Sequence, residues 1–71
     1  MEYIVKMVCI KDNYKNLKYN DTVWLDNVFG RESFTKNKKD ACKFISGVRA
    51  DKLSKKINDS GNFLSYVVKS Y

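Results

Sequence analysis

Lysine dominates the chemistry available to this chain. Of its 71 residues, 14 are Lys or Arg and 8 are Asp or Glu, which gives a formal net charge of +6. Residues 1–30 are electrically neutral, so the whole excess lies in residues 31–71. This asymmetry indicates a face that meets an anionic partner, either nucleic acid or an acidic protein surface. The alternative is that the lysines are ordinary solvated side chains that keep a small protein dispersed.

The densest group of bases falls between residues 36 and 56, and it supplies most of the candidate partner-binding residues. They are Lys38, Lys39, Lys43, Arg49, Lys52, Lys55 and Lys56. Lysine outnumbers arginine here, whereas bidentate recognition of bases prefers arginine. We therefore expect any nucleic acid to be contacted through its phosphate backbone, without sequence specificity.

Two aromatic residues near predicted turns, Tyr19 and Trp24, complete the candidate binding set. Tyr and Trp anchor protein interfaces, and they also stack on unpaired bases. Trp24 has a second interpretation, in which it caps the core while its N–H reaches water or a carbonyl.

The residues that catalysis needs are missing. The chain has no histidine, so it lacks the usual general base near neutral pH. Cys9 lies in an apolar strand-like run and Cys42 in a helix-like run, and neither has an obvious activating partner. Asp51 and Asp59 stand among lysines, and we interpret them as surface salt-bridge partners. Because no phosphate-binding glycine loop and no metal-ligand spacing occurs, the sequence predicts a protein that is not an enzyme and holds no metal or cofactor.

Size and cysteine content indicate one small domain, residues 1–71, with a modest core. The two cysteines could form one disulfide, but we expect two reduced, mostly buried thiols in a cytoplasmic protein. The acidic start and the short apolar run at 3–10 predict no signal peptide, and no run is long enough to span a membrane.

The apolar run at 3–10 predicts the first strand. Apolar residues on both of its sides are typical of a central strand. One side would carry Tyr3, Val5, Met7 and Cys9. The other would carry Ile4, Lys6, Val8 and Ile10. Further strands are predicted at 17–19, 22–25 and 63–68, with an irregular stretch at 26–32 that bends at Gly30.

Two helices are expected between the third and last strands. Asn37 is a candidate N-cap, and the spacing of Ala41, Phe44 and Ile45 predicts the buried side of a first helix that ends at Gly47. A second helix is predicted at 48–58, ended by Ser60 and Gly61. Its inward residues would be Ala50, Leu53 and Ile57.

The resulting fold class is α+β, a small antiparallel sheet with the element order β-β-β-α-α-β and two helices packed on one face. If the helices lie side by side, their outward lysines merge into one basic patch.

The pattern Phe34-Thr35-x-Asn37-x-x-x-Ala41-x-x-Phe44, followed by Ala50, Leu53 and Ile57, resembles one in small phage and prophage accessory proteins of Gram-positive-type bacteria. The composition, rich in Lys, Asn, Tyr and Ile and without proline, is also similar to that of proteins from AT-rich phage genomes. Such accessory proteins include anti-CRISPR and other anti-defence inhibitors. The resemblance implies a stoichiometric inhibitor and transfers no site residues.

Two functions remain open from the sequence. The first is a non-enzymatic, phage-encoded inhibitor that blocks a bacterial defence protein (CRISPR-Cas or similar) or another host protein, including one in a nucleoprotein complex. It would use a basic helical face and exposed aromatics. The alternative is a nucleic-acid-binding accessory protein without sequence specificity. An edge strand at 17–19 would also permit self-association by sheet extension.

Overall fold

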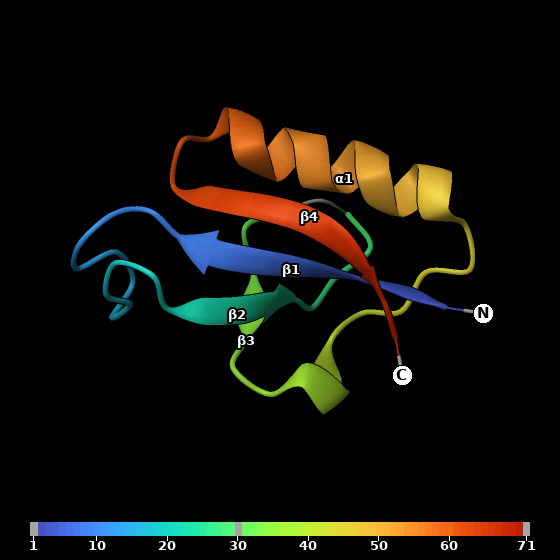
Figure 1. Ribbon diagram of the computed structural model, residues 1–71, viewed down its shortest axis with the longest axis horizontal. Helices are drawn as coiled ribbons and strands as arrows, with labels where there is room; N and C mark the ends of the chain where they lie inside the picture. Colours follow the sequence, from blue (N-terminus) through green and yellow to red (C-terminus); the bar gives the residue numbers. More distant parts are fainter. Residues whose placement is uncertain (1, 30, 71) are drawn as a thin grey trace.

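Four strands, one helix and one short 3-10 turn make up the part of the chain that the computed structural model describes, residues 2–29 and 31–70 (Figure 1). The elements are β1 (Tyr3–Cys9), β2 (Thr22–Leu25), β3 (Phe34–Thr35), η1 (Lys38–Asp40), α1 (Gly47–Asp59) and β4 (Phe63–Lys69). The strands form one antiparallel sheet in the order β3-β2-β1-β4. The α+β class and the antiparallel sheet are confirmed, but one helix is found where two were predicted. The predicted bend at Gly30 lies outside the described residues.

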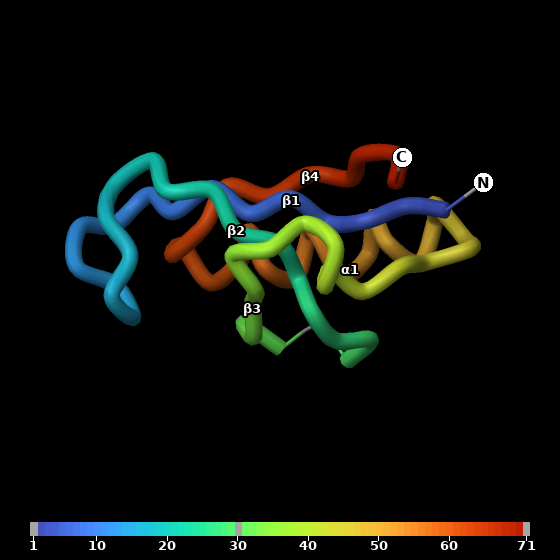
Figure 2. Tube along the Cα trace, turned by 90° about the horizontal axis from the view of Figure 1, so that it is seen from below, coloured from blue at the N-terminus to red at the C-terminus, as the bar shows by residue number. Residues whose placement is uncertain are grey.

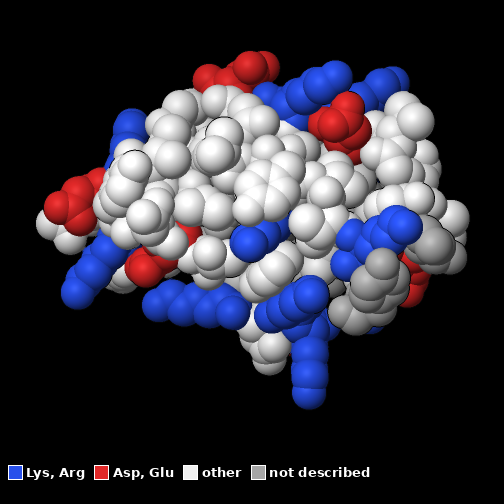
Figure 3. Space-filling view, in the orientation of Figure 1, with Lys and Arg blue, Asp and Glu red and all other residues white. Residues whose placement is uncertain are grey.

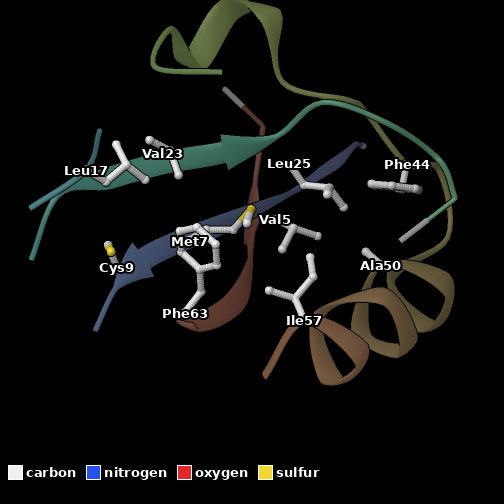
Figure 4. Packing of buried hydrophobic residues seen from close by; sticks show 10 residues of the cluster. All are labelled: Val5, Met7, Cys9, Leu17, Val23, Leu25, Phe44, Ala50, Ile57 and Phe63. Atoms are coloured by element: carbon white, nitrogen blue, oxygen red, sulfur yellow. The ribbon is translucent and has the colours of Figure 1, made fainter. Parts of the chain in front are cut away.

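Strand β1 is central, as its sequence predicts, and its two sides have different neighbours. Val5, Met7 and Cys9 are fully buried and belong to the main hydrophobic cluster. Ala50 and Ile57 of α1 point toward this side of β1 (Figure 4). Figure 2 shows α1 on one side of β1 and β4, while no helix or strand of the described chain lies on the opposite side of these two strands, where Ile4 near the termini is nevertheless buried. The sheet therefore has one core face and one open face.

Helix α1 begins and ends at residues that suit its two ends. The Ser46 side chain accepts a hydrogen bond from the Arg49 N–H at 3.3 Å, which satisfies one of the free N–H groups of the first turn. At the other end Gly61 takes a φ of +77°, a left-handed conformation that glycine adopts without steric cost. The predicted end at Ser60 and Gly61 is confirmed.

The first predicted helix is wrong. Asn37 does cap a turn, accepting from the Lys39 N–H at 3.0 Å, but that turn is the short η1 and the backbone is extended again at Ala41. Tyr3 and Phe44 exchange two backbone hydrogen bonds of 2.7 and 2.8 Å, so the segment after η1 runs beside the start of β1. These pairings bury Phe44 without a helix, whereas Ile45 points outward and is 84% exposed. Gly47 starts α1 and does not end a helix.

The strand predicted at 17–19 is also absent from the described chain. Tyr14 and Leu17 instead close a tight turn with backbone hydrogen bonds of 3.0 and 2.8 Å. Lys15 and Asn16 at its centre have φ values of 49° and 65°, the left-handed geometry of a type I′ turn. Leu17 is buried as a core residue from this loop, so its apolar character reflects packing and not strand pairing.

Strand β4 is an edge strand of the sheet and lies next to α1. The Asn58 side chain of α1 covers part of the free backbone edge of β4. Asn58 accepts from the Ser65 N–H at 2.6 Å and donates to the Ser65 carbonyl at 3.1 Å. The amide thus occupies the two backbone groups that an added strand would use at this point. Self-association by sheet extension at 17–19 is not supported, because that segment is not a strand in the structure.

Glu32 contacts two parts of the chain that are distant from it in sequence, the loop at Tyr14 and the segment 60–62. Its carboxylate accepts from the Tyr14 hydroxyl at 3.2 Å, the Ser60 hydroxyl at 3.0 Å and the Asn62 amide at 2.9 Å. Burial, with Glu32 as a second cause, raises the pKa of Tyr14 above its ordinary value of 10.0. The folded state therefore holds the Tyr14 phenol proton more tightly than the unfolded chain does. The contribution of protonated Tyr14 to the free energy of unfolding is complete at neutral pH and declines as the pH rises above 10.

Substituting Glu32→Ala should lower the free energy of unfolding by about 1–3 kcal/mol, since it leaves two partly buried donors, Tyr14 and Asn62, without their shared acceptor. Urea unfolding followed by circular dichroism measures the change. Glu2→Ala is the matched control, because Glu2 is exposed. Equal unfolding midpoints for the two variants would show that the Glu32 contacts do not stabilise the fold.

Candidate interaction surface on the open face of the sheet

The open face of the sheet combines apolar, aromatic and basic side chains. Strand register assigns to it Ile4, Lys6, Val8, Thr22, Trp24, Thr35, Leu64, Tyr66 and Val68. Leu64 is 56% and Tyr66 43% exposed, whereas Ile4 is buried at the end of the face near the chain termini. No carboxylate occurs among these strand residues. The face therefore offers exposed apolar area without negative charge.

Three side chains form a row across the middle of this face. Lys6 of β1 pairs with Trp24 of β2 on one side and with Tyr66 of β4 on the other. Antiparallel neighbours on one face are in side-chain contact range, and the two rings are separated by two strand spacings, roughly 10 Å. We call Trp24, Lys6 and Tyr66 the aromatic row.

Each ring of the aromatic row has a lysine over it. The Lys6 Nζ lies 5.6 Å from the centre of the Tyr66 ring. The Lys38 Nζ lies 5.4 Å from the Trp24 ring, which links η1 to the row. Figure 3 looks onto this face and shows a largely uncharged area with one basic side chain in its middle and further basic side chains along the border on the η1 side.

A shallow, open hollow of about 520 Å³ lies next to Lys38, at the end of the open face near the termini. It is lined by Glu2, Asn37, Lys38, Lys39, Lys43 and Ser70. Three lysines against one carboxylate leave this hollow with a net positive charge. We call it the lysine hollow.

The predicted basic patch is split in two by the structure. Lys38, Lys39 and Lys43 come together at the lysine hollow. The remaining lysines of the set, Lys52, Lys55 and Lys56, are exposed on α1, at the opposite margin of the molecule from η1 (Figure 1). The single basic helical face is wrong, because residues 41–46 are not helical and no second helix lies beside α1 in the described chain.

Two of the predicted binding residues on α1 already have partners within the chain. Lys55 forms an ion pair with Asp51 at 3.2 Å, which confirms Asp51 as a surface salt-bridge partner, and both side chains are mostly exposed. Arg49 donates through Nη2 to the Val28 carbonyl at 3.4 Å. Both contacts are on the surface, so each contributes little to stability. The Asp51 carboxylate also offsets the charge of Lys55, whereas Arg49 keeps its full positive charge beside a neutral carbonyl.

The two predicted aromatic candidates lie in different places. Trp24 is half-buried on the open face, opposite the main hydrophobic cluster, so the core-capping interpretation does not describe it. Tyr19 is 61% exposed in the loop 10–21, at the end of the sheet far from the chain termini (Figure 1). Sequence reasoning missed Lys6 and Tyr66. A lysine inside an apolar central strand is the signal that could have identified the row, but the register that joins it to Trp24 and Tyr66 is visible only in the structure.

The two cysteines lie in buried or partly buried surroundings. Cys9 is buried and its Sγ donates to the Lys11 carbonyl at 3.0 Å. Burial raises the pKa of the Cys42 thiol, with Asp26 adding to the effect and Arg49 opposing it, so the nucleophilic thiolate is disfavoured. Both cysteines are free. Within the described ranges, no three Cys, Asp or Glu side chains gather closely enough to hold a metal ion, and α1 is neither long nor apolar enough to cross a membrane.

Comparisons of this chain with protein-family models, with curated proteins and with solved structures find no match. Function is therefore inferred from the chain's own residues.

Proposed function

We propose that this protein is a non-enzymatic accessory protein that binds single-stranded nucleic acid on the open face of its sheet, in the cytoplasm of a bacterial host. The aromatic row carries the proposal: two rings, one on each side of Lys6, on a face without carboxylates. Stacking on exposed rings and phosphate contacts with lysine are the two interactions that bind single strands without sequence specificity.

The lysines over the rings do not prevent stacking. A cation over an exposed aromatic ring contributes about 0.5–1 kcal/mol. A stacked base contributes about 1–3 kcal/mol and leaves the displaced lysine free to meet a phosphate. An arriving strand can thus take the ring faces of Trp24 and Tyr66 while Lys6 and Lys38 turn to its backbone.

Other occupants suit this face less well. Bases in a duplex are stacked on one another and cannot reach the two rings. A second copy of the chain would bring the lysines of one open face against those of the other, and each copy has a formal net charge of +6. Single strands expose bases and phosphates together, which matches the mixture of rings and lysines.

A second candidate is the inhibitor of a bacterial defence or host protein that the sequence resemblance implies. One observation favours it: Val28, Phe29, Ile45 and Val48 are exposed, and none of them belongs to a strand of the sheet. Exposed apolar side chains of this kind are typical of protein contacts when they cluster. Capture of the same bacterial protein from a lysate with and without nuclease treatment would favour this second candidate.

Fluorescence anisotropy with a labelled oligothymidylate tests the first proposal. We expect micromolar binding at low salt, with log K falling against log salt by about 0.7 for each phosphate neutralised. A duplex of the same length should bind more weakly, and a matched RNA strand shows whether the 2′-hydroxyl matters. Absence of binding at low salt, or tighter binding to the duplex, would contradict the proposal.

A further inference from the structure

We infer that the lysine hollow is the phosphate-binding subsite of this protein and sets the path of the bound strand. The inference rests on the proposed function and adds the route of the backbone. The strand would cross the aromatic row with its bases and then pass Lys38, so that its following phosphates enter the hollow beside Lys39 and Lys43.

Lys38 connects the two parts of this path. Its Nζ lies 5.4 Å from the Trp24 ring, and the same side chain lines the hollow. A base stacked at Trp24 therefore places its own phosphate beside the entrance of the hollow. The open shape of the hollow admits a flexible chain, since it is a depression in the surface and not an enclosed cavity.

The chemistry of the hollow suits a phosphodiester chain. Lys39 and Lys43 are exposed and supply ammonium groups, each with three donors and no acceptor. The Asn37 side chain is held by its capping bond to the Lys39 N–H, so η1 presents its lysines from a fixed turn. Glu2 is the one carboxylate in the lining, so its charge opposes the three lysines only in part.

The lysines of α1 serve as the control for simple net charge. Lys52 and Lys56 are exposed, as Lys39 and Lys43 are, but they belong to α1, which lies at the opposite margin of the molecule from η1 (Figure 1). Lys38 and Lys39 of η1 line the hollow. The double variants Lys39→Gln/Lys43→Gln and Lys52→Gln/Lys56→Gln lose the same charge. Any difference in binding between the two variants is therefore due to the position of the lysines and not to the net charge of the protein.

Oligothymidylate binding by both double variants over a range of salt tests the inference. The Lys39/Lys43 variant should reduce the slope of log K against log salt by about 0.7 for each phosphate that the protein no longer neutralises, whereas the Lys52/Lys56 variant should keep the wild-type slope. Equal slopes for the two variants, or a larger change in the α1 variant, would overturn the phosphate path.

Inorganic polyphosphate, a probe without bases, separates this inference from the proposed function. NMR titration should shift the backbone amides of residues 37–43 more than those of α1. If the oligonucleotide binds but the two variants behave alike, the hollow fails as a subsite while single-strand binding stands. If the oligonucleotide does not bind, the proposed function fails; polyphosphate shifts at 37–43 would then support the hollow alone, and unshifted amides would reject both.

Discussion

Phe63→Ala should unfold this domain or bring it close to unfolding at room temperature. Phe63 is 1% exposed and lies at the start of β4, paired with Cys9 of β1. Its ring makes edge contacts with Tyr14 and Phe34 at centroid distances of 5.7 and 5.8 Å. Truncating a buried phenylalanine costs about 3–5 kcal/mol. Domains have about 5–15 kcal/mol in total, and short chains lie toward the low end.

Urea unfolding followed by circular dichroism measures this loss, and Phe29→Ala is its matched control. Phe29 is the same residue type but 69% exposed in a loop, so its removal should change stability by about 0.5 kcal/mol or less. Phe63→Leu keeps most of the buried volume and should remain folded at a lower midpoint. Similar midpoints for Phe63→Ala and Phe29→Ala would show that the core is not built around the β1–β4 pair.

Tyr66→Ala should weaken single-strand binding roughly 5- to 150-fold. This is the loss of affinity expected when one base no longer stacks on an aromatic ring, because such stacking contributes about 1–3 kcal/mol to binding. The effect on folding should be small, because the ring points away from the main hydrophobic cluster and is 43% exposed. Anisotropy titrations and urea unfolding, run on the same preparation, separate the two effects.

Tyr19→Ala is the matched control for Tyr66→Ala. Tyr19 is an exposed tyrosine that the sequence also marks as a candidate binding residue, but it lies in the loop 10–21 and not on the open face. We expect the Tyr19→Ala variant to bind the single strand with wild-type affinity. If Tyr19→Ala loses as much affinity as Tyr66→Ala, the contact surface extends around the loop end of the sheet and is not centred on the row.

Most of the fold follows from local patterns that the sequence displays directly. Residues 3–10 carry apolar side chains on both sides, which predicts a central strand. The position of β1 between β2 and β4 confirms this, although one side of β1 lies on the open face and is not fully buried. Helix α1 has its inward stripe at Ala50 and Ile57 and a stop at Gly61, so its bounds are nearly those predicted. These features depend on short-range spacing alone.

The errors arise where long-range pairing overrides a local pattern. Ala41 and Phe44 have helical spacing, but the same two positions are buried when the chain runs extended and pairs with Tyr3. Leu17 and Tyr19 alternate like a strand, but left-handed residues at 15 and 16 close a turn first. The pairing of Phe44 with Tyr3 joins residues that are far apart in sequence, and the left-handed turn at 15 and 16 contains no glycine that would mark it. Local spacing alone therefore favours the helix and the strand over the structures that form.

The candidate site was predictable only in part for the same reason. Trp24 and the three lysines of the hollow stand out by residue type, whereas the patch assumed to join them to α1 depended on a helix that does not form. Lys6 and Tyr66 become partners of Trp24 through the register of three strands. The register is set only when the sheet assembles, and it places residues that are far apart in sequence next to one another on one surface.

Intrinsic fluorescence gives the most direct test of the aromatic row, because Trp24 is the only tryptophan of the chain. Adding oligothymidylate should quench its emission, with the same midpoint and the same salt dependence as the anisotropy of the labelled strand, and Tyr66→Ala should shift both curves together. Emission that stays unchanged while the anisotropy reports a bound strand would contradict the account, since the strand would then lie elsewhere on the protein.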